Sequence, residues 1–111
     1  MKKIKINLQT PIIDKNEVDL VSKCIRQKKL SFKGEFVNKF EKKFEKFIGG
    51  GYAASVSNGT TAIELALASL NISKNDEVII PNYCFAAVVN AVMSIGAKPV
   101  IVDVNLKTWT I

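Results

Sequence analysis

Apolar residues recur at steps of three and four along the first half of the chain, and this spacing predicts two amphipathic helices. The first helix is expected over residues 14–28, where Asp14 and Glu17 have the spacing of a capping box. The second is expected over residues 35–48, with its phenylalanines on one face, and the glycines at 49–51 end it. A short loop joins the two helices.

From residue 52 onward, short apolar runs alternate with helical periodicity. The predicted elements are strands at 52–56, 77–80 and 99–104, and helices at 60–70 and 84–95. Strand and helix alternating over short links are typical of a parallel α/β sheet with flanking helices, and near-continuous apolar strands favour a sheet covered on both faces. Because three parallel strands alone leave raw edges, we expect an incomplete sheet at the N-terminal end of a longer protein.

This pattern divides the chain into an N-terminal helical segment, residues 1–48, and the start of an α/β domain, residues 49–111. Charge follows the same division. The net charge of the chain is +6, and residues 1–48 hold 13 Lys and Arg against 6 Asp and Glu. The lysines are spread over helices and mixed with acids, so a solvated surface is favoured over a nucleic-acid site. No nucleic acid is expected as a partner.

The amino-acid composition further limits the class of protein to which the chain can belong. Of 111 residues, 48% are apolar and 23% charged, as in ordinary globular proteins. No signal peptide follows the basic start, and no apolar run approaches the roughly 20 residues that cross a bilayer. We therefore expect a cytoplasmic protein without a membrane partner. Histidine is absent, and Cys24 and Cys84 have no metal-binding spacing, so reduced thiols and no metal site are expected.

One segment, SVSNGTTA at residues 55–62, lies where a predicted strand turns into a helix. A helix N-terminus has free N–H groups and a partial positive charge, which suit a phosphate. The candidate residues are Gly59, which lets a ligand approach the backbone, and Thr60 and Thr61, which add hydroxyl donors. The segment has neither the lysine of a P-loop nor a dinucleotide fingerprint. These residues alone leave a phosphate site and a plain cap by Ser57 or Asn58 equally open.

Residues 81–86 follow the next predicted strand and therefore open at the same carboxyl edge of the sheet, where ligands of open α/β sheets bind. Phe85 there offers an aromatic ring that can stack on a flat heterocycle. Its spacing also places it on one apolar helix face with Val88, Val89 and Val92. From the spacing alone, a core position for Phe85 is favoured.

Three stretches, SNGTTAIELALASL, NDEVIIPNYCF and GAKPVIVDV, resemble the DegT/DnrJ/EryC1/StrS sugar aminotransferases. The resemblance runs from Ile6 onward and keeps order and spacing. It implies an α/β fold, the N-terminal part of the aspartate-aminotransferase-type (fold type I) large domain, with pyridoxal 5'-phosphate as cofactor. The segment SFKGEFVNKFE resembles the perosamine synthetase branch, which aminates a 4-keto-6-deoxy sugar carried on GDP.

The resemblance also implies roles for individual residues. In the family, the glycine-threonine turn holds the cofactor phosphate, and the matching positions are Gly59, Thr60 and Thr61. The aromatic residue after the second strand stacks on the pyridine ring, and it matches Phe85. The Schiff-base lysine and the acid against the pyridine nitrogen lie beyond the end of this chain in the family, and none of Lys74, Lys98 and Lys107 matches that lysine. No catalytic residue is therefore expected here, and the chain alone is predicted to be inactive.

The same resemblance implies partners. These are a nucleotide-sugar substrate, an amino donor such as glutamate, and a second copy in a homodimer when the protein is full length. The pathway implied is amino-sugar or surface polysaccharide (O-antigen) biosynthesis. The loop at 30–34 lies near the sugar-nucleotide site in relatives, and Asp103 is interpreted as structural. Two other hypotheses are a truncated, non-catalytic relative that binds a phosphate ligand or a partner, and a nucleic-acid-binding protein that uses the basic first half.

Overall fold

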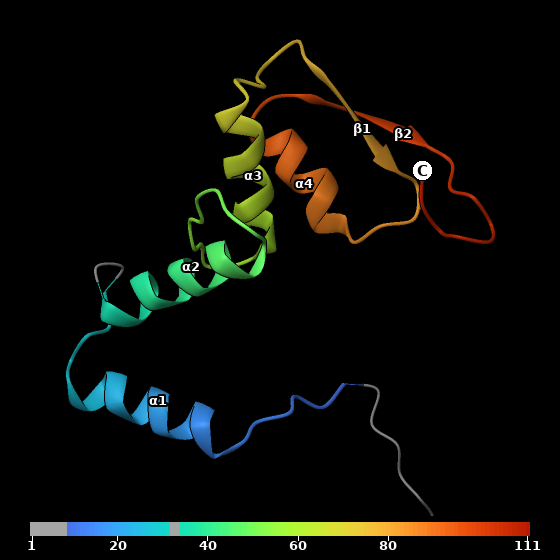
Figure 1. Cartoon of the computed structure of the whole chain (residues 1–111). Helices are drawn as coiled ribbons and strands as arrows, with labels where there is room; N and C mark the ends of the chain where they lie inside the picture. The colour runs from blue at the N-terminus through green and yellow to red at the C-terminus, as the bar shows by residue number, and fades with distance from the viewer. Residues whose placement is uncertain (1–8, 32–33) are drawn as a thin grey trace, which may run out of the picture. The chain divides into compact units, whose positions relative to one another are not determined.

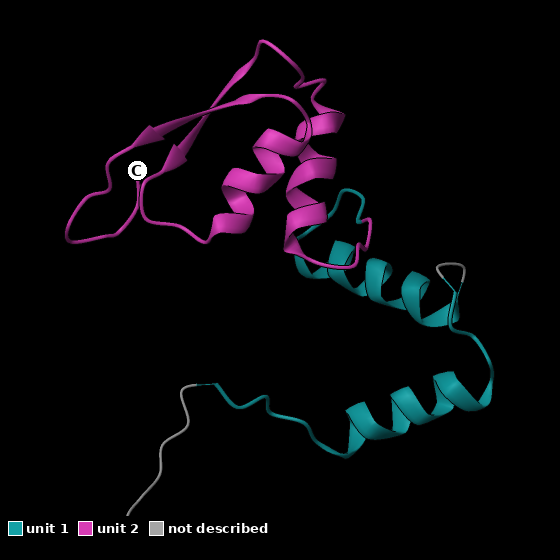
Figure 2. Cartoon of the chain, turned by 180° about the vertical axis from the view of Figure 1, so that it is seen from behind, with its two compact units in different colours: residues 1–53 teal, residues 54–111 magenta. Residues whose placement is uncertain are grey.

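The computed structural model describes residues 9–31 and 34–111 (Figure 1). The basic start of the chain, and Phe32 and Lys33 of the loop at 30–34, lie outside the described residues. The elements are α1 (Lys15–Arg26), α2 (Glu35–Phe47), α3 (Gly59–Ser69), β1 (Glu77–Pro81), α4 (Ala86–Ser94) and β2 (Lys98–Val102). They fall into two compact units, unit 1 with residues 1–53 and unit 2 with residues 54–111 (Figure 2).

In unit 1, the predicted capping box starts α1. The Asp14 carboxylate accepts the N–H of Asn16 at 2.6 Å, and the Glu17 carboxylate accepts the N–H of Asp14 at 2.9 Å. These bonds satisfy backbone donors that the first turn leaves free. The sequence prediction of this helix start is confirmed.

Three glycines end α2, as predicted. Gly49, Gly50 and Gly51 have φ angles of 88°, 135° and 85°, in the region that residues with a Cβ rarely adopt. The N–H of Gly50 bonds the carbonyl of Glu45 at 2.9 Å and closes the last turn. The chain therefore leaves α2 abruptly after Ile48.

Unit 2 is a strand–helix–strand arrangement with one further helix. β1 and β2 pair in parallel, with Ile79 opposite Val100, and α4 connects them. α4 packs against both strands, and α3 packs against α4. The core is small and consists of Ile80, Ala91, Val92 and Ala97, each at most 5% exposed.

The predicted strand at 52–56 is wrong. These residues form no strand, and the sheet in the described residues is two-stranded. A strand exists only through the ladder bonds it makes with a neighbour, and an apolar run does not specify that neighbour. Within the described residues, Ile79 and Ile101 of this sheet stay 61% and 59% exposed, which agrees with an incomplete sheet, and coverage of both faces in a longer protein stays a prediction.

Candidate functional site

Asn58 caps α3 and occupies only some of the backbone N–H groups at the start of this helix. The Asn58 side-chain oxygen accepts the N–H of Thr61 at 3.0 Å, and its carbonyl accepts the N–H of Ala62 at 3.1 Å. Of the two candidates for this cap, the structure selects Asn58. Within residues 9–31 and 34–111, the N–H groups of Gly59 and Thr60 donate to no described acceptor. The positive end of the helix dipole therefore presents two N–H groups that can bind an anion.

The space beside Gly59 is open. A Cβ added at this position meets nothing within 4 Å, and φ at Gly59 is not in the left-handed region. Neither packing nor backbone conformation within the described residues therefore calls for glycine here. Close approach of a ligand to the backbone does call for it. The half-buried Thr60 and Thr61 place hydroxyl groups in the same first turn. These groups fit the phosphate of the cofactor implied by the sequence.

Phe85 lies immediately before α4, not within it. The helix begins at Ala86, and Phe85 has φ −69° and ψ 137°, which is extended backbone. The Phe85 side chain is 82% exposed, so the core position that its spacing favoured is wrong. Helical spacing misled because the residue is the N-cap, where the chain has not yet turned onto the helical repeat. The exposed ring is free to serve as a stacking surface.

The two candidate segments share one end of unit 2. α3 and α4 begin at the same end of the helix pair, as both views show (Figures 1 and 2). The segment that carries Phe85 leaves the carboxyl end of β1, as predicted from strand–helix alternation. The structure thus places Gly59, Thr60, Thr61 and Phe85 on the same side of this unit.

Two lysines of unit 2 lie away from this end. Lys98 and Glu77 open the paired strands and form an ion pair at 2.7 Å, at the opposite edge of the sheet from Phe85. The hydrogen bond from Lys98 to Glu77 raises the pKa of the Lys98 ammonium, which favours its charged form. Lys74 lies beside Gly96, just past the end of α4. Lys107 differs, because it lies in the loop that follows β2.

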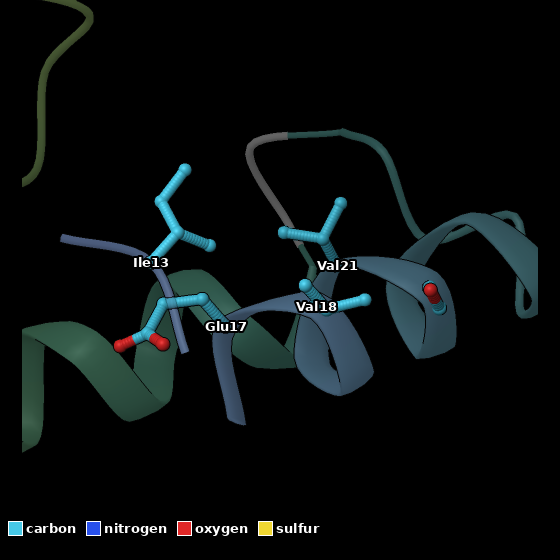
Figure 3. Close-up of a pocket in the computed structure, with 5 residues that line it drawn as sticks. Ile13, Glu17, Val18 and Val21 are labelled. Atoms are coloured by element: carbon cyan, nitrogen blue, oxygen red, sulfur yellow. The ribbon is translucent and has the colours of Figure 1, made fainter. Parts of the chain in front are cut away.

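The grooves described in the chain are elsewhere. One of about 390 Å³ is lined by Ile13, Glu17, Val18, Val21 and Ser22, and Figure 3 shows their side chains around the start of α1. A second, of about 500 Å³, is formed by residues of α1 and α2, namely Leu20, Lys23, Phe36, Lys39, Phe40 and Lys43. Neither groove includes a predicted site residue.

In the described residues, Cys, Asp and Glu side chains form no cluster that could hold a metal ion. None of the described helices has the length and apolarity that a membrane crossing requires.

Sequence reasoning missed one contact at the candidate end, an aromatic pair of Tyr83 and Trp109. No local pattern signals it, since pairing of β1 with β2 brings these distant positions together.

Comparison with known proteins places this geometry in context. Residues 11–111 match the model of the DegT/DnrJ/EryC1/StrS aminotransferase family. The chain is 41% identical over 104 residues to the GDP-perosamine synthase of Escherichia coli O157:H7, covering 94% of this chain and 29% of that protein. The chain thus spans less than a third of the length of that relative.

Solved structures agree. An aminotransferase from Psychrobacter cryohalolentis superposes with a TM-score of 0.79 at 34% identity, covering 86% of this chain and 24% of that one. The E. coli GDP-4-keto-6-deoxy-D-mannose-3-dehydratase with bound hydrated pyridoxal phosphate superposes with a TM-score of 0.83 at 28% identity, covering 96% and 28%. The fold is that of the N-terminal part of a fold type I enzyme, and the family is dependent on pyridoxal phosphate. This chain belongs to the DegT/DnrJ/EryC1/StrS aminotransferase family.

Proposed function

We propose that the chain is the cofactor-binding start of a pyridoxal-phosphate-dependent aminotransferase that acts on a nucleotide-linked 4-keto-6-deoxy sugar, with glutamate as amino donor. The match to a GDP-perosamine synthase at 41% identity supports the substrate class. The observation that carries the proposal is the start of α3, where two unengaged amides meet open space beside Gly59.

Each candidate residue has a physical task in this proposal. The amides of Gly59 and Thr60, with the hydroxyls of Thr60 and Thr61, bind the cofactor phosphate through charge-assisted hydrogen bonds. The exposed Phe85 ring packs on the flat pyridine and limits its tilt. When bound, the cofactor supplies the electron sink for amino transfer, while these residues fix its position.

The remaining parts of the proposal concern the whole protein. The Schiff-base lysine and the acid against the pyridine nitrogen come from residues after Ile111, so the 111-residue chain alone is inactive. The complete enzyme is a cytoplasmic homodimer in amino-sugar or surface polysaccharide synthesis. The division into a helical segment, 1–48, and a cofactor-binding part, 49–111, belongs to this proposal.

The test measures binding of the phosphate group and stacking of the pyridine ring separately. In the product of the complete reading frame, Gly59→Val fills the open space and weakens binding of both pyridoxal phosphate and inorganic phosphate, at least about tenfold, because an anion loses close backbone contact. Phe85→Ala weakens pyridoxal phosphate about threefold to tenfold and leaves inorganic phosphate unchanged. Equilibrium dialysis measures both affinities.

Matched controls keep these outcomes specific. Ala68→Val adds a branched side chain at another exposed position of α3, and Tyr52→Ala removes another exposed ring, so both should bind like the wild type. Wild-type affinity in Gly59→Val would refute the phosphate site. With a GDP-linked 4-keto-6-deoxy sugar and glutamate, amine formation is expected. Loss of a hydroxyl without amination would instead assign the dehydration named for the E. coli structure.

A further inference from the structure

Tyr83 and Trp109 form an aromatic pair beside the proposed stacking surface. Their ring centroids are 4.9 Å apart and their planes meet at 56°, a tilted arrangement that is favourable for aromatic rings. Tyr83 lies two residues before Phe85, in the segment between β1 and α4, whereas Trp109 lies in the loop after β2. Figure 1 shows this last loop returning to the end of β1.

The backbone of the last loop places Trp109. The Asn105 side chain accepts the N–H groups of Lys107 at 2.8 Å and Thr108 at 3.3 Å. The Asn105 carbonyl accepts the N–H of Trp109 at 2.8 Å, and the Asn105 N–H donates to the carbonyl of Thr110 at 2.9 Å. Trp109 has φ +57°, which a residue with a large side chain adopts only when its surroundings impose it. The backbone that carries the Trp109 ring is therefore held by its own loop.

The segment that carries Phe85 is tied down at three points. The N–H of Asn82 donates to the carbonyl of Val102 at 2.8 Å, which fixes its start to the end of β2. The Phe85 carbonyl accepts the N–H of Val88 at 3.0 Å, which fixes its end to α4. Between them, the contact of Tyr83 with Trp109 is the side-chain tie that the structure describes. The direction of the exposed Phe85 ring depends on the backbone between these points.

We propose that Trp109 is a positioning residue for the cofactor ring. It holds Tyr83, and through the backbone of residues 83–85 it sets the orientation of the Phe85 ring against the pyridine. This inference rests on the proposed function. It also separates two parts of binding, because the phosphate donors are on α3, outside the segment that Trp109 constrains. Loss of Trp109 should therefore affect the ring and not the phosphate.

The experiment compares affinities for pyridoxal phosphate and inorganic phosphate in the product of the complete reading frame. Trp109→Ala should weaken pyridoxal phosphate about threefold to tenfold, the range for loss of one aromatic pair, and leave inorganic phosphate unchanged. Trp109→Phe keeps a ring and should restore most of the affinity. Tyr83→Ala should match Trp109→Ala, and the double variant should be no weaker than either single variant, because both remove the same contact.

Each outcome decides the matter. Wild-type affinity for pyridoxal phosphate in Trp109→Ala overturns the inference, as does an equal loss for both ligands, which marks a general loss of structure. If Trp109→Ala fails to fold by circular dichroism, Tyr83→Leu and Trp109→Phe carry the same comparison. The proposed function fails by a different result, namely if the Gly59→Val and Phe85→Ala variants bind pyridoxal phosphate as tightly as the wild type does.

Discussion

Asn58 shows how one side chain decides what a helix end can bind. Its carboxamide oxygen accepts a hydrogen bond from the N–H of Thr61 at 3.0 Å and a second from the Thr61 hydroxyl at 3.3 Å. Among the backbone donors of the first turn, the amides of Gly59 and Thr60 are therefore left for an anion at α3. The sequence predicted a cap or a phosphate site as alternatives, and the cap leaves room for the second, because it uses a different donor.

The cap should contribute to stability without a ligand. Asn58→Ala is expected to lower the free energy of unfolding by about 1 kcal/mol, the usual cost of losing an N-cap side chain. Urea unfolding of the chain measures it. Asn90→Ala, at an exposed position inside α4, is the matched control and should change stability less. An equal effect of both variants would show that the cap bond is not stabilising.

Glu35 carries the largest described shift of a carboxyl group. Hydrogen bonds from Lys39 and then Lys29, with their positive charges, lower the pKa of Glu35 from 4.5 to about 2. A folded pKa below the unfolded one means that the contribution is complete above about pH 4.5 and is lost as pH falls toward 2. Because the pair is exposed, its contribution is small.

This sign gives a pH test. Glu35→Gln should flatten the fall of unfolding free energy between about pH 4.5 and 2, measured by urea titrations at several pH values. Asp19→Asn on α1, an exposed carboxylate changed to an amide in the same way, should leave that fall in place. An unchanged fall in Glu35→Gln would remove the ion pair from the account of acid stability.

At the scale of elements, local signals were sufficient where the element is held by its own residues. The capping box of α1 and the glycines after α2 act within a few residues, and both predictions are confirmed. The strand at 52–56 failed because its status depends on a partner strand elsewhere. The Phe85 position failed at a helix boundary, where spacing does not distinguish the first helical residue from the cap before it.

The free energy of unfolding should be most sensitive to substitutions where α4 packs on the sheet. Val92 is 1% exposed and packs with Ile80 and Ala97. Val92→Ala removes two methyl groups and leaves a cavity, so the free energy of unfolding should fall by about 2 kcal/mol. Met93→Ala changes the neighbouring residue, which is 60% exposed, and should cost far less. Similar values for the two, measured by urea unfolding, would contradict the assigned core.

At the scale of the whole molecule, the sequence predicted the common end at which the two candidate segments lie, and it did not predict the chemistry of that end. Alternation of strand and helix predicted that Phe85 and the SNGTT turn would open on one side. Helices α3 and α4 do begin at the same end of the helix pair, although no strand precedes the SNGTT turn in the described residues. The function proposed for those residues came from family resemblance, since a phosphate donor set and a plain cap look alike in one sequence. The Tyr83–Trp109 contact was beyond reach, because it depends on strand pairing and on a loop with φ +57° at a tryptophan.

The glycines at 49–51 provide a site at which the chain can be cut by a protease. Exposed glycine stretches suit proteases, and a single cut there separates the amphipathic helices from residues 54–111. All four candidate positions, and the tryptophan proposed to steer one of them, remain on the released piece. Cofactor retention by that piece after limited digestion would mean that vitamin B6 recognition requires no help from the first fifty residues.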